Sequence, residues 1–364
     1  MVDFEFPCPQ RSIAALACSL LAHYGLQPPN PTLPEADNLL ASRPRNVVLL
    51  LLDGLGEWLI RRHLSEKHFL IRHNMGTLSS VFPPTTAAAA TALESGLFPA
   101  QSGWLGWSVY WPELDNNVNL YPNTTPDGRS AAPVHLGETY LSFQTLTGQI
   151  QGVEGVEAAA LTGDRTRLDT LFQAVGSICR RPGRHFLYAY LDQPDHLLHK
   201  EGCQSRHAAQ LLQTVDRLLE TAFPTWPDTL LLVTADHGFL DLDGRCLEDF
   251  PALTATLRLP PSIEPRALNC FVKPGQDAAF LQALYQAVGD AYTVYPRAEV
   301  LRTALFGPGL EHPRFRTMVG DYLAVARTPL TLFPTRQYQA SMCAGHGGMT
   351  SEELTVPLIA AWHL

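Results

Sequence analysis

Three long runs of apolar residues, each followed closely by acidic residues, most constrain the folds that this sequence can adopt. The runs are Val47–Leu52, Phe186–Leu191 and Leu230–Thr234. Continuous apolarity, as opposed to alternation, is typical of strands that are buried on both faces in a parallel sheet. Because ligands bind at the carboxyl ends of strands in such sheets, the acidic residues are expected to gather at one edge.

Other segments predict helices and a smaller unit. Apolar residues at helical spacing between Leu211 and Leu219 predict a crossover helix. Residues 251–335 are interrupted by prolines and have their own strand, helix and strand pattern, and Val356–Ala361 returns as a final strand. We therefore predict an α/β fold with a mostly parallel sheet, helices on both faces and a small inserted α+β subdomain. The expected boundaries are 1–45 for an N-terminal helix and lead-in, 46–250 with 336–364 for the main core, and 251–335 for the insertion.

Composition excludes several classes of partner. The 364 residues include 26 Lys and Arg against 35 Asp and Glu, a net charge of −9, without a run of five basic residues. We therefore expect no nucleic-acid polymer as a partner. The apolar stretch Ile13–Leu21 is too short to cross a bilayer and lacks the basic region of a signal peptide. The seven cysteines form no Cys-x-x-Cys pair. These features predict a cytoplasmic protein with no membrane partner, and they leave open whether it forms a homo-oligomer.

Two segments place acidic and imidazole side chains where a metal ion could bind. Asp53 follows the first apolar run and precedes Gly54, a setting that also suits a helix N-cap. Asp195 and His199 are four residues apart, so a helical turn places both on one face. His196, the competing imidazole, would point away from Asp195 on such a turn.

Two further segments complete the set of candidate ligands. Asp236 and His237 directly follow the third apolar run, where adjacent oxygen and nitrogen donors favour a metal over a packed core. His346 stands between Gly345 and Gly347 and is presented from a loop. Three aspartates and three histidines are enough for two divalent cations, which can bind an attacking oxygen and neutralise a transferring phosphoryl group.

A loop of prolines and threonines offers a nucleophile. Phe82–Thr86 leads into Ala87–Leu93, a segment of good helix formers. A threonine at that helix start would meet unpaired backbone N–H groups and the positive end of the helix dipole, which suit a phosphate. Thr is also a common N-cap. Because metal coordination is one of the few ways to activate a threonine hydroxyl, Thr86 is the candidate nucleophile and Thr85 the alternative.

In their order along the chain, these segments resemble the motifs of the alkaline phosphatase superfamily, within it the type I phosphodiesterase/nucleotide pyrophosphatase branch. The family pattern has an Asp after the first strand, a Phe-Pro-x-x-Thr loop before a helix ending in Gly-Leu-x-Pro, Pro-Asp-x-x-x-His, Asp-His-Gly and a Gly-flanked His. The five matching motifs are Asp53; Phe82–Thr86 with Gly96–Pro99; Pro194–His199; Asp236–Gly238; and His346. Each motif alone has low specificity, but five motifs in this order are specific for the family.

The resemblance implies an alkaline phosphatase-like fold with two divalent metal ions, Zn²⁺ before Mn²⁺ or Mg²⁺. By resemblance, one zinc is held by Asp195, His199 and His346, and the other by Asp53, Asp236, His237 and Thr86. Thr86 then attacks phosphorus in line, and water activated by the first zinc hydrolyses the phosphothreonine intermediate.

The sequence departs from the family at one substrate-binding position. Family phosphodiesterases place an Asn shortly after Gly-Leu-x-Pro, where it helps hold a phosphoryl oxygen, and Gly103–Trp107 contains none. We expect either that Trp107 shapes a different substrate pocket or that Asn116 or Asn117 replaces the missing donor.

The predicted function is hydrolysis of a small phosphorylated substrate by a phosphodiesterase or nucleotide pyrophosphatase-like enzyme. A phosphonate hydrolase, or a phosphomonoesterase or phosphomutase of the same superfamily, is the alternative. A sulfatase is disfavoured because the loop at Pro84–Ala87 lacks the required Cys or Ser. A metal-binding scaffold without turnover is a third hypothesis, and it predicts the loss of at least one ligand or of the nucleophile.

Overall fold

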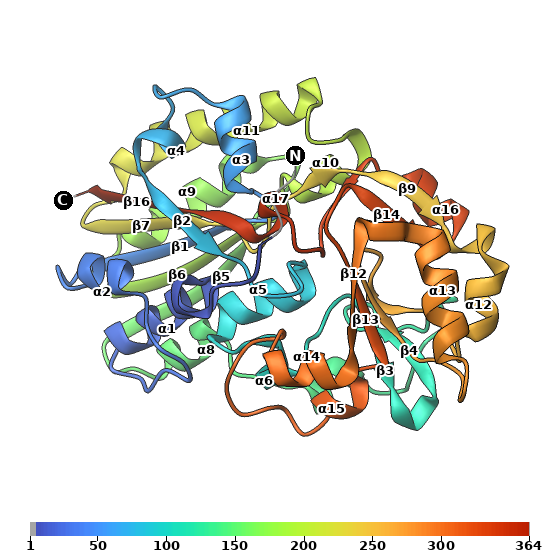
Figure 1. Ribbon diagram of the computed structural model, residues 1–364. Helices are drawn as coiled ribbons and strands as arrows, with labels where there is room; N and C mark the ends of the chain where they lie inside the picture. Colours follow the sequence, from blue (N-terminus) through green and yellow to red (C-terminus); the bar gives the residue numbers. More distant parts are fainter. Residues whose placement is uncertain (1–4, 364) are drawn as a thin grey trace.

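The three apolar runs form neighbouring parallel strands in the larger of two lobes (Figure 1). The computed structural model describes residues 5–363, so residues 1–4 of the predicted lead-in and Leu364 lie outside the described residues. No helix within residues 5–363 has both the length and the apolar character needed to cross a bilayer.

The sheet of the larger lobe has the order β2-β16-β7-β1-β6-β5, and β16 runs antiparallel to both of its neighbours, β2 and β7. Every residue of β1 is buried, as its continuous apolarity predicts. Leu52 lies opposite Leu191 of β6, so the neighbouring strands end at the same level. The strands are β1 (Asn46–Leu52), β2 (Asn74–Ser79), β5 (Val156–Thr162), β6 (Arg184–Leu191), β7 (Thr229–Thr234) and β16 (Thr355–His363).

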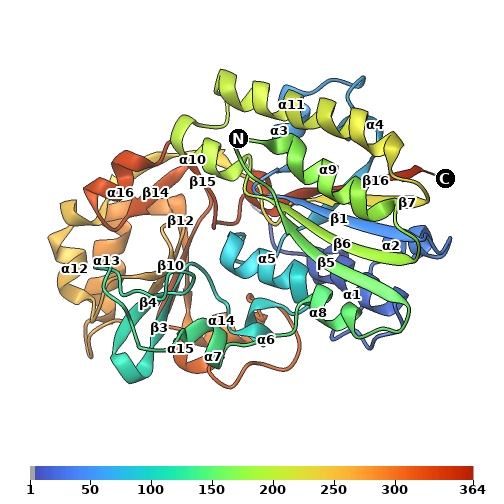
Figure 2. The ribbon, with the colours of Figure 1, turned by 180° about the vertical axis from the view of Figure 1, so that it is seen from behind.

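Helices cover both faces of this sheet (Figures 1 and 2). One face carries α1 (Ile13–His23), α2 (Pro34–Leu40), α5 (Thr86–Ser95) and α8 (Leu146–Gln151). The other carries α3 (Glu57–His63), α4 (Phe69–Arg72), α9 (Leu168–Cys179) and α11 (Arg206–Ala222). The predicted crossover helix is α11, which buries Leu212, Val215 and Leu219. The predicted fold class is thus confirmed.

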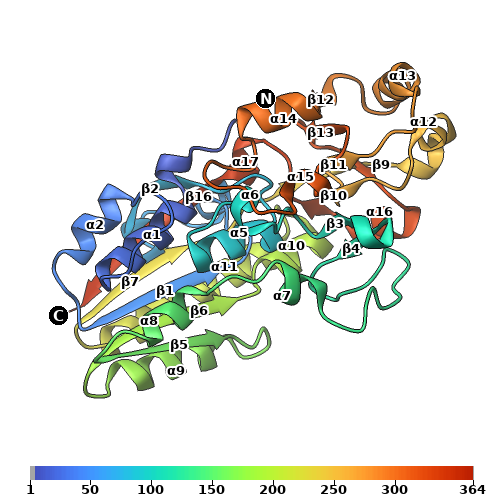
Figure 3. The ribbon, with the colours of Figure 1, turned by 90° about the horizontal axis from the view of Figure 1, so that it is seen from below.

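The smaller lobe contains an antiparallel sheet of order β12-β13-β11-β10-β3-β4 (Figure 3). Its strands are β3 (Ser108–Trp111), β4 (Asn116–Asn119), β10 (Ser262–Glu264), β11 (Ala267–Cys270), β12 (Tyr292–Pro296) and β13 (Tyr322–Ala326). Residues 251–335 therefore supply four of these strands, while β3 and β4 come from the segment after α5. The boundaries at 251 and 335 stay a prediction.

Short elements complete the described chain. Two pairs of short strands are β8 (Leu240–Asp241) with β15 (Ala344–Gly345) and β9 (Asp243–Cys246) with β14 (Leu330–Phe333). The remaining α-helices are α6 (Pro99–Ser102), α7 (Leu136–Tyr140), α10 (Asp195–Glu201), α12 (Pro251–Thr256), α13 (Asp277–Val288), α14 (Arg297–Thr303), α15 (Phe315–Met318), α16 (Arg336–Ser341) and α17 (Ser351–Leu354).

Candidate active site

The sheet register brings Asp53 and Asp236 together at the carboxyl ends of β1 and β7. The backbone N–H of Asp53 donates to Leu191 O at 3.0 Å, which fixes the end of β1 against β6. Oδ1 of Asp236 accepts from the backbone N–H of Gly54 at 3.1 Å. Gly54 has a φ of +74°, and a Cβ there would lie 2.6 Å from the Phe239 ring, so only glycine fits this turn.

The first cluster of potential ligands consists of Asp53, Asp236 and His237. Their ligand atoms lie within 4.8 Å of one another, and all three residues are buried. Nε2 of His237 lies 3.4 Å from Oδ1 of Asp53 and 3.5 Å from Oδ2 of Asp236. One imidazole nitrogen and two carboxylates therefore face a common point.

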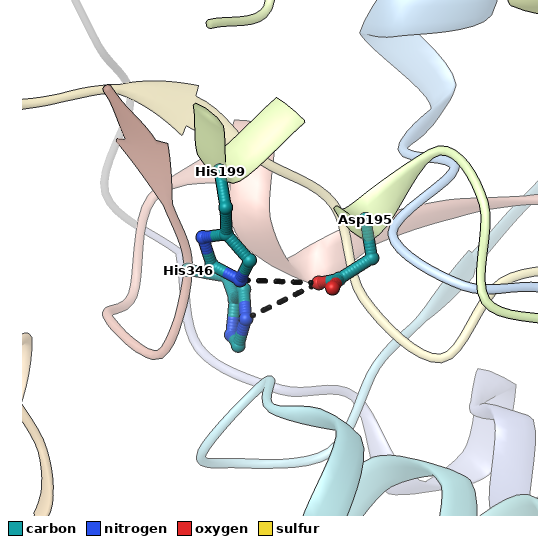
Figure 4. Close-up of side chains that lie close together, drawn as sticks. All are labelled: Asp195, His199 and His346. Atoms are coloured by element: carbon teal, nitrogen blue, oxygen red, sulfur yellow. Dashed lines mark ion pairs between the residues drawn. The ribbon is translucent and has the colours of Figure 1, made fainter. Parts of the chain in front are cut away.

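The second cluster consists of Asp195, His199 and His346, whose ligand atoms also lie within 4.8 Å of one another. Figure 4 shows the Asp195 carboxylate facing both imidazoles, one from α10 and one from the loop after β15. Its Oδ1 lies 3.3 Å from Nε2 of His199 and 3.6 Å from Nε2 of His346. The two clusters adjoin, because the rings of His237 and His346 stack with centroids 3.8 Å apart.

All three histidines are oriented by backbone carbonyls. Nδ1 of His199 lies 2.9 Å from Ala344 O, Nδ1 of His346 lies 3.1 Å from Pro84 O, and Nδ1 of His237 lies 3.1 Å from Gly238 O. A carbonyl only accepts, so each Nδ1 carries a proton and each Nε2 is the ring nitrogen that faces its cluster. This is the usual arrangement of histidines that bind metal through Nε2.

Each of the two clusters contains a buried carboxylate oxygen without a hydrogen-bond partner. Oδ2 of Asp236 and Oδ1 of Asp195 are buried and meet no hydrogen-bond partner among the described residues. Burial, followed by the neighbouring carboxylates of Asp236 and Asp195, raises the pKa of Asp53. Burial raises the pKa of Asp236 to about 7. Orphaned buried oxygens beside imidazole nitrogens fit two divalent cations, which would supply positive charge to both clusters.

Thr86 begins α5 directly beside the first cluster. Its Oγ1 lies 3.4 Å from Oδ1 of Asp53 and 3.2 Å from Nε2 of His237. The hydroxyl of Thr85 instead donates to Oε1 of Glu264 at 2.7 Å. Of the two threonines, Thr86 is therefore the one whose hydroxyl lies at the clusters.

The other candidates from the sequence differ in how close they lie to the two clusters and Thr86. His196 belongs to neither cluster, and its Nε2 lies 2.9 Å from Nζ of Lys200. Trp107 is 44% exposed and lines the same cavities as Thr86. Nδ2 of Asn117 donates to Pro260 O at 2.8 Å, and Asn117 lines a neighbouring cavity without Thr86. Asn116, at the start of β4, lines neither cavity that contains Thr86.

Two cavities meet at Thr86. One of about 300 Å³ extends toward the smaller lobe and is lined by Trp107, Glu264 and Tyr338 among others. The second, of about 350 Å³, is lined by Glu94, Tyr121 and Tyr190 among others. Apart from Trp107, the residues named here were not selected from the sequence. Most of them belong to segments far from Thr86 in the chain, and their local sequence does not indicate a site.

Comparisons with known proteins identify a family and a shared fold. The family model described as type I phosphodiesterase / nucleotide pyrophosphatase matches residues 121–308, just over half of the chain. A search of curated protein sequences gave no match.

Solved structures share the fold at low sequence identity. Murine ectonucleotide pyrophosphatase / phosphodiesterase 5 is 17% identical, with a TM-score of 0.63 over 86% of this chain and 87% of that one. An inactive threonine-to-alanine variant of the murine protein, in complex with AMP, is 16% identical, with a TM-score of 0.60 over the same shares of the two chains. Phosphonoacetate hydrolase from Sinorhizobium meliloti in complex with phosphonoformate is 16% identical, with a TM-score of 0.64 over 88% and 91%.

Proposed function

Because the chain belongs to the type I phosphodiesterase / nucleotide pyrophosphatase family and is a hydrolase of phosphoric esters, we propose that it is a two-metal phosphodiesterase with Thr86 as its nucleophile. The observation that carries the proposal is the position of the Thr86 hydroxyl, 3.4 Å from Asp53 and 3.2 Å from His237. The inactive threonine-to-alanine variant of the murine neighbour supports the choice of a threonine.

Two cations would be held by the two clusters. The residues for one are Asp195, His199 and His346, and those for the other are Asp53, Asp236, His237 and Thr86. Zn²⁺ is the proposed metal because each cluster offers oxygen and imidazole nitrogen donors in a set of three, which leaves a position for an oxygen of the reaction. When bound, the cations lower the pKa of an oxygen nucleophile and neutralise the transferring phosphoryl group.

The chain's own residues would carry the covalent steps. Thr86 gives up its hydroxyl proton, and the Oγ1–P bond forms as the bond from phosphorus to the leaving oxygen breaks. The leaving oxygen takes up a proton from solvent. Water then bonds to phosphorus as the P–Oγ1 bond breaks, and Oγ1 recovers a proton, so that one water is consumed per ester bond. The positive end of the α5 dipole favours the phosphoryl oxygens beside Thr86.

A diester fits this site better than a monoester. Two cavities share Thr86, Trp107 and Asp195, and each offers room for one ester arm. Phosphonate hydrolysis is the second candidate, because the bacterial neighbour with the same fold is a phosphonoacetate hydrolase. The test is a screen of monoesters, diesters and phosphonates with metal-loaded protein and products identified by mass. Hydrolysis of monoesters alone would reject the proposal. The cytoplasmic location and a homo-oligomeric state stay predictions.

Replacing His346 with alanine is expected to remove one of two cations per chain and to lower kcat/KM by about 100-fold or more, because one cluster loses a ligand. Metal content is measured by atomic emission and activity with bis-p-nitrophenyl phosphate. His207→Ala, at an exposed histidine paired with Glu201, is the matched control and should change neither quantity. Full metal occupancy in the His346 variant would remove His346 from the ligand set.

A further inference from the structure

We propose that two copies of this chain associate through the outer edge of β5, whose strands pair antiparallel about a two-fold axis at Leu161. The six-stranded sheets of the two larger lobes would then form one continuous sheet. β5 is the last strand in the order of its sheet and lies at the edge of the lobe (Figure 2). The pairing requires neither the cations nor Thr86, so it is independent of the proposed hydrolysis.

Hydrogen bonds at the two ends of β5 show which backbone groups point outward. The N–H of Gly163, just past the strand, donates to Tyr190 O of β6 at 2.7 Å. Odd-numbered residues of β5 therefore direct their N–H and C=O groups toward β6, and even-numbered residues direct theirs away from the sheet. In agreement, the N–H of Ala158 donates not to β6 but to Oε1 of Gln151 at 2.9 Å.

Ala160 and Thr162 are the two other even-numbered residues in the second half of β5. No hydrogen bond of their outward N–H groups is found among the described residues, and both residues are exposed. β5 contains no lysine or proline, and its register with β6 is continuous, without a bulge. It therefore lacks the features that usually keep an edge strand from pairing with another chain.

The opposite edge of the same sheet is covered by the chain itself. Its outer strand is β2, where Nε of Arg11 donates to Thr77 O at 2.8 Å. Ser12 forms a bridge with Ser79 along the same strand. One edge of the sheet is thus capped by the N-terminal segment, while the end of β5 is left open to a second strand.

A two-fold axis at Leu161 satisfies the open groups reciprocally. Ala160 then lies opposite the partner's Thr162, each such pair exchanges two hydrogen bonds, and the axis generates the pair twice. Leu161, which is half-buried, faces its own copy across the axis and adds an apolar contact. The bond from Ala158 to Gln151 stays intact in this register.

The charges around β5 favour a second copy in the antiparallel direction. Glu154 and Glu157 lie at the start of the strand, whereas the turn after it holds Arg165 and Arg167 against Asp164. An antiparallel pair places the acidic start of each strand near the basic turn of the other, whereas a parallel pair would align like charges. Glu154 and Arg167 are both exposed, and neither forms an ion pair within residues 5–363. They are the residues that we assign to the contact between copies.

The first test is sedimentation equilibrium of the full chain, with and without bound zinc, between about 1 and 100 µM. We expect the mass to rise with concentration from that of one chain to that of two. Thr162→Pro should raise the dissociation constant by about 10-fold or more, because it removes an outward donor but no hydrogen bond within the chain. The mass of a single chain at every concentration would overturn the proposal.

A charge exchange tests the orientation of the two strands. Glu154→Arg and Arg167→Glu should each raise the dissociation constant by about threefold or more, since each places like charges at the contact. The double variant should return it to within about twofold of the wild-type value. Glu299→Arg, at an exposed residue of the smaller lobe, is the matched control and should leave the dissociation constant unchanged. Failure of the double variant to recover would reject the antiparallel contact.

An introduced thiol tests the position of the axis. In Leu161→Cys the two copies of the residue form a non-hydrogen-bonded pair, whose Cα atoms are about 4.5 Å apart, within the range of a disulfide. Oxidation by copper phenanthroline should link two chains through the peptides that contain position 161, as identified by mass. Tyr285→Cys, at an exposed position on α13, should give no such link through position 285. A dimer without the link at position 161 would place the interface elsewhere and reject the proposal.

Folding of each variant is checked by near-ultraviolet circular dichroism. If Thr162→Pro does not fold, the charge exchange, which alters only exposed side chains, still decides between the outcomes. Hydrolysis of diesters is measured on the same samples. A monomer that hydrolyses diesters would reject the interface alone, and a dimer without hydrolysis would reject the proposed function alone.

Discussion

Replacing Thr86 with alanine is expected to lower kcat by about 10³-fold or more, while the protein keeps two cations per chain. The reason is that the variant loses the oxygen that forms the bond to phosphorus, but none of the six carboxylate and imidazole ligands. Activity is measured with a p-nitrophenyl diester, and metal content by atomic emission. Thr86→Ser, which keeps a hydroxyl, should retain more activity than Thr86→Ala.

The control for this prediction is the neighbouring threonine. Thr85→Val removes a hydroxyl that donates to Glu264, so kcat is expected to fall by less than about tenfold. Quenching with acid during turnover should also trap a covalent adduct on the wild-type peptide that contains Thr86. If Thr86→Ala turns over normally, or if the adduct maps to another residue, Thr86 is not the nucleophile.

Replacing Glu353 with alanine is expected to lower the free energy of unfolding by about 3–5 kcal/mol. Glu353 and Arg266 are 0% and 1% exposed and form a two-bond ion pair at 2.6 and 2.9 Å. Glu353 also accepts from the backbone N–H of Gly348 at 2.7 Å and from the hydroxyl of Thr350 at 2.8 Å. Its loss would leave a buried guanidinium and these donors unpaired. Denaturant unfolding followed by tryptophan fluorescence measures the change.

An exposed pair of the same residue types provides the comparison. Glu220 is 50% exposed and pairs with Arg72 on the surface, so Glu220→Ala should cost less than about 1 kcal/mol. Equal costs in the two variants would contradict the role given to burial. Because Gly348 follows His346 by two residues, Glu353→Ala should also weaken metal binding by the second cluster.

Much of the fold was predictable because burial leaves a mark on local sequence. The segments Asn46–Leu52 and Thr229–Thr234 are buried along their whole length and appear as uninterrupted apolar runs. The edge strand Val156–Thr162 was not predicted, since only Val156 in it is buried and small residues dominate. The short strands β3 and β4 were missed for a related reason: they contain few residues, and β3 joins the sheet by pairing with β10, which is distant in sequence.

The candidate site was predictable to the extent that strand ends determine it. Asp53 and Asp236 directly follow buried strands, and one helical turn separates Asp195 from His199, so these four residues could be selected from the sequence. The structure places them beside His237, His346 and Thr86. Their roles as ligands and nucleophile stay predictions. Glu264 was not predicted, because its contact with Thr85 spans 179 residues and nothing in its local sequence indicates it.

The position of β16 in the sheet has a consequence for biosynthesis. β16 lies between β7 and β2 and pairs with both, although about 120 residues or more separate it from either in the chain. While a ribosome is still translating the preceding segments, β2 has no neighbour, and β7 has an open edge that could pair with another nascent chain. The larger sheet can therefore close only once residues 355–363 have left the exit tunnel.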